Sequence, residues 1–306
     1  MVELIHKTIQ LHKPIQGETT TDLLFTNSKS FSNTKILVIP GNPGIVSFYI
    51  EFIKTLHAET GYDIVGISHI GHCGRVKNKN FSVEDQIQHK SLVIDYLLDQ
   101  HWSIEKDKQK DIEFILIGHS VGSYVSLKLL SRFSHRYQFR LCCNLFPTFR
   151  HLYNGLSPFI KLAIYNPIRW SFANFLHYIP QTVTNQVFKW ILSDDETRIG
   201  VSQKINYDMA SNILYMAYTE ALDIREVDSE VQSVFDGRLT DLFFIYGQTD
   251  NYTPPHFYEE LKKQYPSGNI EYASKEVPHA FVLSHSKPVA IRVSEFINQK
   301  CSNTKQ

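Results

Sequence analysis

Short apolar runs recur along the chain and end abruptly at turn residues. Runs of this kind are typical of β-strands that are buried on both faces. Segments with helical periodicity lie between them, so the pattern predicts a mostly parallel sheet that is covered by helices on both sides. The runs are "KILVIP", "YDIVGISH", "IEFILIG", "FRLCCNLF", "DLFFIYG" and "NIEYASKEV".

The intervening segments carry helix signals of different strength. Residues 45–55 are a predicted helix, and Ser82 with Asp85 forms a capping-box pattern ahead of another. Near the N-terminus, "ELIHKTIQL" and "TDLLFTN" flank a Gly/Pro-containing turn region and predict a strand pair. Apolar side chains at helical spacing mark two further helices, at Val121, Val125 and Leu129, and at Val289, Val293, Phe296 and Ile297.

The alternation stops between residues 147 and 238, where aromatic and aliphatic residues gather without a clear strand. We interpret residues 147–238 as an apolar helical cap inserted into a single α/β domain that spans residues 1–306. From Glu113 to Asp194 every intervening charge is positive. Apolar side chains with spaced cations suit a lipid surface, where Lys and Arg reach the headgroups. The alternative is an ordinary cap, with its apolar residues turned towards an active site.

Composition excludes several classes of function. Lys and Arg total 31, as do Asp and Glu, so the net charge is zero. The sequence therefore lacks the basic excess that would indicate a nucleic-acid partner. The four cysteines have neither metal-ligand spacing nor a paired framework, which favours a reducing compartment. The N-terminus lacks the apolar region of a signal peptide, and no stretch has the roughly 18 apolar residues of a membrane span. Membrane contact is therefore expected to be peripheral or monotopic.

The strand "FILI" leads directly into Gly118-His119-Ser120-Val121-Gly122, and a predicted helix follows at once. This is a G-x-S-x-G pattern in the strand–turn–helix context of an α/β-hydrolase nucleophile, where larger residues at 118 and 122 would collide with neighbouring elements. The helix N-terminus also favours developing negative charge. The sequence therefore predicts Ser120 as a nucleophile.

A serine nucleophile needs a base and an orienting acid, which α/β hydrolases supply in the order Ser, acid, His. Asp250 follows the predicted strand "LFFIYG", and His279 lies in "VPHAF" after the next one. The other usual position for the acid follows "FRLCCNLF", but no Asp or Glu occurs between Glu113 and Asp194. We therefore expect Asp250 to be the acid and His279 the base.

The segment "VIPGNPG" follows the first buried run, where this fold places a loop that donates one oxyanion N–H. The prolines fix a tight loop, and Pro43 favours an extended Asn42. We expect the N–H groups of Asn42 and Val121 to form the oxyanion hole, in which each donor contributes on the order of 3 kcal/mol. A simple structural turn is the alternative for this loop.

Metal and cofactor chemistry have little support in the sequence. His69, His72 and His119 lie near the predicted site, but acidic and thiol ligands at suitable spacing are missing. We expect no metal and no cofactor, and we interpret these histidines as packing or supporting residues.

Taken in order, "VIPGNPG" followed by "FY", "HIGHCG", "LIGHSVGSY", "YGQTDNYTP" and "PHAFVLSHS" resemble the landmarks of the lipid droplet-associated serine hydrolases over most of the chain. The resemblance implies Ser120 as nucleophile, Asp250 as acid and His279 as base. It also implies residence on lipid droplets and the cytosolic face of the endoplasmic reticulum, and weak hydrolysis of lipid esters, with sterol esters as one candidate. The H-G-G-G motif of many lipases is replaced by "PGNPG", so a vigorous triglyceride lipase is not implied.

Two other functions fit the same sequence. The chain could coat or tether droplets with a weak or vestigial triad, because a complete triad alone does not establish the main function. It could also be a soluble carboxylesterase or thioesterase that uses no lipid surface.

Overall fold

The computed structural model describes residues 3–26, 32–102, 111–179, 183 and 206–302. Their centre is an eight-stranded sheet of order β1-β2-β4-β3-β5-β6-β7-β8. Strands β3 to β8 are parallel, whereas β2 pairs antiparallel with both β1 and β4. The predicted mostly parallel sheet is thereby confirmed. Its strands are β1 (Leu4–Ile15), β2 (Glu18–Thr26), β3 (Thr34–Ile39), β4 (Asp63–Ile67), β5 (Glu113–His119), β6 (Gln138–Leu145), β7 (Leu242–Tyr246) and β8 (Asn269–Tyr272).

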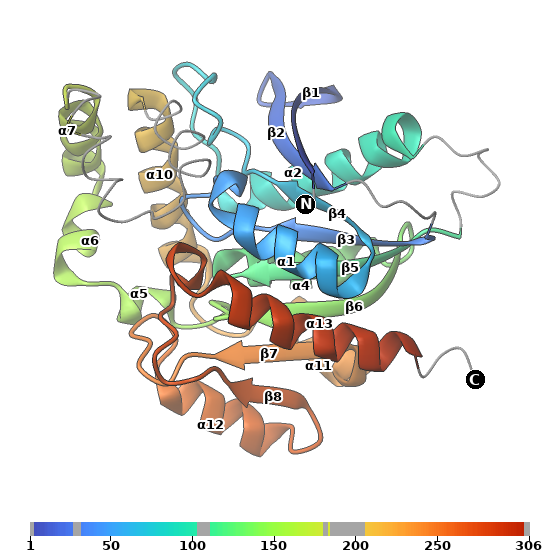
Figure 1. Cartoon of the computed structure of the whole chain (residues 1–306). Coiled ribbons are helices and arrows are strands. Elements are labelled where there is room, and N and C mark those ends of the chain that lie inside the picture. Colours follow the sequence, from blue (N-terminus) through green and yellow to red (C-terminus); the bar gives the residue numbers. More distant parts are fainter. Residues whose placement is uncertain (1–2, 27–31, 103–110, 180–182, 184–205, 303–306) are drawn as a thin grey trace.

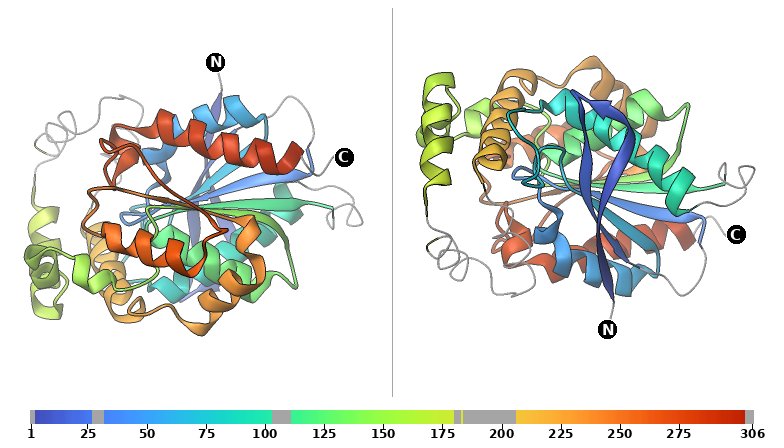
Figure 2. Two further views of the ribbon diagram at one scale, coloured as in Figure 1. Left: turned by 90° about the horizontal axis from the view of Figure 1, so that it is seen from below. Right: turned by 90° about the horizontal axis from the view of Figure 1, so that it is seen from above.

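Helices cover both faces of the sheet, as the two views of Figure 2 show. On one face lie α1 (Ile50–Thr60) and α13 (Ser286–Ser302), which pack against each other. The other face carries α2 (Val83–Tyr96), α4 (Val121–Phe133), α11 (Ser229–Arg238) and α12 (Pro255–Gln264). The two faces enclose separate apolar clusters, as expected when a buried strand directs alternate side chains to opposite sides.

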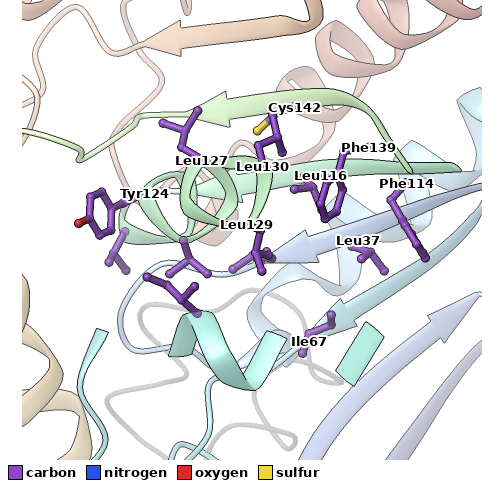
Figure 3. Packing of buried hydrophobic residues seen from close by; sticks show 14 of the residues in the cluster. Leu37, Ile67, Phe114, Leu116, Tyr124, Leu127, Leu129, Leu130, Phe139 and Cys142 are labelled. Atoms are coloured by element: carbon purple, nitrogen blue, oxygen red, sulfur yellow. The ribbon is translucent and has the colours of Figure 1, made fainter. Parts of the chain in front are cut away.

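The position of α4 is fixed by close apolar packing on the central strands (Figure 3). Leu127, Leu129 and Leu130 of this helix belong to the same cluster as Leu116 of β5 and Cys142 of β6. Burying one leucine contributes about 2 kcal/mol. Because α4 begins one residue after Ser120, this packing also fixes the turn that carries the predicted nucleophile.

The structure contains the helices and strands that local sequence signals predicted, but the bounds of two elements differ. The capping box of Ser82 and Asp85 is present at the start of α2. The helix predicted over 45–55 begins instead with a 3₁₀ turn, η1 (Val46–Tyr49), and α1 then runs to Thr60 because Gly61 caps it with a left-handed φ of 70°. Strand β8 is shorter than the run that predicted it and ends at Tyr272.

The described part of residues 147–238 is helical. Figure 1 shows α5 (Leu152–Gly155), α6 (Pro158–Ala163), α7 (Asn166–His177) and α10 (Tyr207–Asp223) beyond the carboxyl ends of the parallel strands. Helix α11 falls within the same range but covers the sheet beside α4. None of the described helices is both long and apolar enough to cross a bilayer.

Two glycines give a matched test of the nucleophile turn. A Cβ at Gly122 would lie 2.2 Å from the Ile39 carbonyl oxygen, whereas a Cβ at the exposed Gly237 of α11 would meet nothing within 4 Å. We expect Gly122→Ala to lower the free energy of unfolding by about 1–3 kcal/mol or more, and Gly237→Ala to raise it by about 0.5–1 kcal/mol. Urea titration followed by circular dichroism measures both. Equal midpoints for the two variants would contradict the close approach at Gly122.

Candidate active site

Ser120 occupies the turn between β5 and α4. Its φ of 54° and ψ of −124° form a conformation that residues with a side chain rarely adopt, at a cost of about 1–3 kcal/mol. Contacts with neighbouring elements offset this cost. One of them is a hydrogen bond, in which the Ser120 N–H donates to the Leu145 carbonyl of β6 at 2.9 Å. A Cβ on Gly118 would lie 2.3 Å from the Gly122 carbonyl oxygen, which confirms the predicted need for small residues on both sides.

The structure brings His279 and Asp250 to Ser120. Asp250 lies in the loop after β7, and His279 lies between β8 and the 3₁₀ turn η4 (Phe281–Leu283). His279 Nε2 is 3.0 Å from Ser120 Oγ, and its Nδ1 is 2.6 Å from Asp250 Oδ2. A carboxylate accepts only, so Nδ1 carries the proton and Nε2 is left to accept from the serine hydroxyl.

The surroundings of Asp250 keep it ionised. Burial alone would raise the pKa of this carboxyl, but hydrogen bonds outweigh burial and the pKa lies below its ordinary value. Oδ2 accepts from His279 and from the Thr253 hydroxyl at 2.7 Å, and Oδ1 accepts from the Tyr252 N–H at 2.8 Å. Asp250 can therefore orient the imidazole and stabilise its positive charge.

Two N–H groups are expected to stabilise an oxyanion, and both belong to residues near Ser120: Val121 follows it directly, and Asn42 lines the same cavity. Val121 is the first residue of α4, and Asn42 lies in the loop after β3. Within the part of the chain that the structure describes, neither N–H donates to a protein acceptor, whereas the neighbouring N–H of Gly41 donates to the Tyr49 hydroxyl at 2.8 Å. Asn42 and Val121 thus leave donors available beside the serine. The Asn42–Pro43 peptide bond is cis, which the sequence pattern did not indicate.

A hydrogen-bonded chain joins the Asn42 loop to the His279 loop through the nucleophile turn. Tyr49 donates from its hydroxyl to His119 Nδ1 at 2.6 Å, and His119 Nε2 donates to the His279 carbonyl oxygen at 2.8 Å. Burial, with a smaller contribution from His279, lowers the pKa of His119 to about 3, so this ring stays neutral. His119 therefore links the Asn42 loop, through Tyr49, to the loop that carries His279.

A second group of buried side chains supports the Asn42 loop from behind. His72 Nδ1 lies 2.6 Å from the Pro43 carbonyl oxygen, and the His69 N–H donates to the Gly44 carbonyl at 2.8 Å. Lys90, fully buried on α2, contacts His69 Nδ1 at 3.1 Å and donates to the Ser68 carbonyl at 3.1 Å. Burial lowers the pKa of Lys90 well below its usual range. Among the described residues, no three His, Cys, Asp or Glu side chains are arranged to hold a metal ion.

A mostly apolar cavity of about 240 Å³ opens beside Ser120. Its wall combines the Asn42 loop with residues from η1 and η4, including Ile45, Phe48, Val282 and Leu283. A larger cavity of about 560 Å³ lies between α5, α6 and the end of α10 and contains none of the predicted catalytic residues. Chemistry rather than size therefore identifies the smaller cavity as the candidate substrate site.

Fold and site geometry define the class of the protein, an α/β hydrolase with a serine at the nucleophile turn. Solved structures of that fold match nearly the whole chain. A haloalkane dehalogenase from Bradyrhizobium elkani superposes with a TM-score of 0.71 at 12% identity, covering 99% of this chain and 100% of the other. An esterase from Thermogutta terrifontis gives 0.61 at 14% identity, covering 97% and 99%. At these identities the likeness concerns the fold alone.

The chain belongs to the lipid-droplet associated hydrolase family, whose model matches residues 32–282. A protein of Dictyostelium discoideum named lipid droplet-associated hydrolase is 58% identical over 300 residues, covering 97% of this chain and 98% of the relative. Proteins of the same name from Drosophila melanogaster and Gallus gallus are 30% and 29% identical, and cover 86% and 90% of this chain and 89% and 88% of their own length. The resemblance seen in the sequence motifs is confirmed, and with it membership of a family of hydrolases.

The hydrogen bonds that run from Gly41 through Tyr49 and His119 to the loop of His279 predict an effect on catalysis that can be measured separately from the effect on stability. Tyr49→Phe leaves the Gly41 N–H without its acceptor and His119 Nδ1 without its donor, so we expect kcat for a soluble ester to fall about tenfold with little change in KM. The matched control is Tyr137→Phe, because the Tyr137 hydroxyl is also buried and lies within hydrogen-bond distance of two acceptors, the Ser91 carbonyl and Asp95, away from Ser120. Both variants should lose about 1–3 kcal/mol of stability. A similar loss of kcat in both would show that the Tyr49 effect is only structural.

Proposed function

We propose that the protein is a serine esterase that hydrolyses lipid carboxylic esters through Ser120, His279 and Asp250. The observation that carries the proposal is the continuous hydrogen-bonded chain from Asp250 Oδ2 through His279 to Ser120 Oγ, at 2.6 and 3.0 Å. Such a chain activates a hydroxyl that is otherwise a poor nucleophile. The N–H groups of Asn42 and Val121 have no acceptor among the described residues, so they could donate to the negative charge that would develop on the substrate.

The reaction proceeds in two halves. Ser120 Oγ attacks the ester carbonyl carbon while His279 Nε2 takes the hydroxyl proton, and the Asn42 and Val121 N–H groups stabilise the oxyanion. The tetrahedral intermediate collapses as His279 returns the proton to the leaving alcohol, and an acyl-enzyme remains. Water, deprotonated by the same imidazole, then attacks the acyl carbonyl; the bond to Ser120 Oγ breaks as His279 returns the proton to that oxygen, and the acid is released. Asp250 stays ionised throughout and balances the imidazolium charge.

The cavity limits the part of the substrate that can be enclosed beside Ser120. A volume of about 240 Å³ corresponds to roughly eight water volumes of about 30 Å³. We infer that this largely apolar space, as the described residues bound it, takes an acyl chain of comparable size and leaves the alcohol of the ester outside it. We propose lipid esters as the substrate class, with sterol esters as a candidate within it.

The cap offers a surface that suits a lipid monolayer. Side chains on and beside α6 and α7 are large, apolar and 56–79% exposed: Phe159, Leu162, Tyr165, Trp170, Phe175 and Tyr178. Two cations lie among aromatic rings nearby, with Lys161 Nζ 4.7 Å from the ring centre of Tyr153 and Arg169 stacked at 5.0 Å over Tyr215. No acidic residue occurs between Glu113 and Asp194 to repel anionic headgroups. We propose that these helices dock on lipid droplets and on the cytosolic face of the endoplasmic reticulum.

A droplet-coating or tethering role is the second candidate, and the same exposed surface favours it. Both functions need the surface, but only the esterase needs Ser120. A soluble carboxylesterase or thioesterase needs neither droplet nor membrane.

The first test is labelling of Ser120 by a fluorophosphonate, read by intact mass with lipid present. We expect a single adduct on the wild-type protein and none on Ser120→Ala or His279→Ala, together with a loss of ester turnover of at least about 10³-fold in both. Ser123→Ala is the control, because the Ser123 hydroxyl donates to the Gly118 carbonyl and not to His279. A folded wild-type protein that takes up no adduct would leave the coating role as the better account.

The second test is flotation with artificial droplets bounded by a phospholipid monolayer. Replacing Phe159, Trp170 and Phe175 together by serine should reduce droplet binding at least tenfold, because burying each aromatic side chain in lipid contributes about 1.5–3 kcal/mol. Ile291→Ser, at a partly exposed position on α13, should bind as the wild type does. A wild-type protein that fails to float would favour the soluble esterase.

A further inference from the structure

The side chain of Asn42 connects the candidate oxyanion loop to a helix of the cap. Its Nδ2 donates to the Ile213 carbonyl at 2.9 Å and to Glu220 Oε1 at 3.1 Å. Both acceptors belong to α10, more than 170 residues further along the chain. The residue expected to supply one oxyanion donor from its backbone is therefore held through its side chain by the cap.

Glu220 is an unusual residue for its position. It is only 5% exposed, and none of the described residues forms an ion pair with it. Burial raises the pKa of this carboxyl to about 8, and the hydrogen bond from Asn42 opposes the shift only in part. A buried carboxyl without a cation is costly, and an apolar side chain would fill the same place without that cost. Unlike an apolar side chain, Glu220 can accept the hydrogen bond from Asn42.

We propose that Glu220 is a positioning residue of the catalytic site, which holds Asn42 so that its backbone N–H points at the oxyanion formed on Ser120. The inference rests on the proposed esterase function and adds to it that α10 and the oxyanion loop work as one unit. Glu220 acts through Asn42 and does not touch the reacting atoms. Because a donor must be aimed at the position of the oxyanion to within a few tenths of an ångström, loosening Asn42 weakens catalysis more than substrate binding.

The charge of Glu220 provides a readout that a purely structural role lacks. When neutral, its carbonyl oxygen accepts from Asn42 without opposing the developing oxyanion; when ionised, it adds a negative charge beside that site. The raised pKa means that ionisation occurs as the pH rises through about 8. Among the described residues, Tyr252 from the loop after β7 is the titratable group that interacts with Glu220, whereas the pKa of Glu220 itself is set by burial and by the hydrogen bond from Asn42. Burial, Asp250 and Glu220 together raise the pKa of Tyr252, so Tyr252 stays neutral over this range.

The test compares Glu220→Gln with Glu220→Met in steady-state hydrolysis of a soluble p-nitrophenyl ester between pH 6.5 and 9.5. Gln keeps a neutral acceptor for Asn42, and Met keeps the volume without one. We expect Glu220→Met to lower kcat by about 10- to 100-fold with KM nearly unchanged. Glu220→Gln should stay within about threefold of the wild type at pH 7 and lack the wild-type decline above pH 8. Equal kcat in wild type and Glu220→Met, or an equal loss in Gln and Met, would overturn the proposal.

A matched control separates this effect from general damage to the helix. Asn212 is also buried on α10, but it donates to the Lys79 carbonyl and accepts from the Phe81 N–H, away from Ser120. Asn212→Leu should therefore destabilise the protein comparably and change kcat much less. If it lowers kcat as strongly as Glu220→Met does, the proposal is wrong.

A double-mutant cycle keeps the proposal testable if Glu220→Met folds poorly. Asn42→Ala removes the same hydrogen bond from the other side, together with the bond to the Ile213 carbonyl, and keeps the backbone N–H. If the two residues act through one bond, the double variant should be no slower than the slower single variant. Losses that multiply would overturn the inference. A wild-type protein that shows neither a fluorophosphonate adduct nor turnover would instead contradict the esterase proposal, whatever Glu220 does.

Discussion

The site depends on the close approach of three backbone segments at the nucleophile turn. Gly118, at the end of β5, and Gly122, in the first turn of α4, leave no room for a methyl group, and Gly122 also abuts Ile39 at the end of β3. This contact holds Ser120 in a conformation that it would not adopt alone, with its hydroxyl facing His279. The apolar packing of α4 on the central strands maintains it (Figure 3). The core of the domain thus maintains the strained backbone conformation of Ser120.

The loop that contains Asn42 is held by hydrogen bonds from three different elements. Tyr49 binds it through the Gly41 N–H, His72 through the Pro43 carbonyl, and α10 through the Asn42 side chain. Each contact uses a polar group that would be costly to leave unpaired in the interior. A loop with two glycines and two prolines needs such external support, because its own residues contribute few side chains that could anchor it.

The sequence predicted the sheet, the helices on both faces and the residues that the structure brings together at the site, because these leave local signals. The strand runs, the G-x-S-x-G turn, and the acid and histidine after successive strands can all be recognised from neighbouring residues. Tyr49, Lys90 and Glu220 left no such signal, since their roles depend on contacts with residues far away in the chain, 70 positions for Tyr49 and His119 and 178 for Glu220 and Asn42. For His119 the motif itself marked the position, but only the tertiary structure shows what it joins.

The two edges of the sheet differ in length and in the charge of their exposed side chains. Strand β8 is only four residues long at one edge, whereas β1 is twelve residues long and lies at the other. Along β1, Lys7, Lys13 and the histidines His6 and His12 point to its exposed positions. Short or charged edge strands resist pairing with a second chain. On the lipid surface proposed above, copies would be confined to two dimensions and would meet often, and edges of this kind would oppose polymerisation through the sheet.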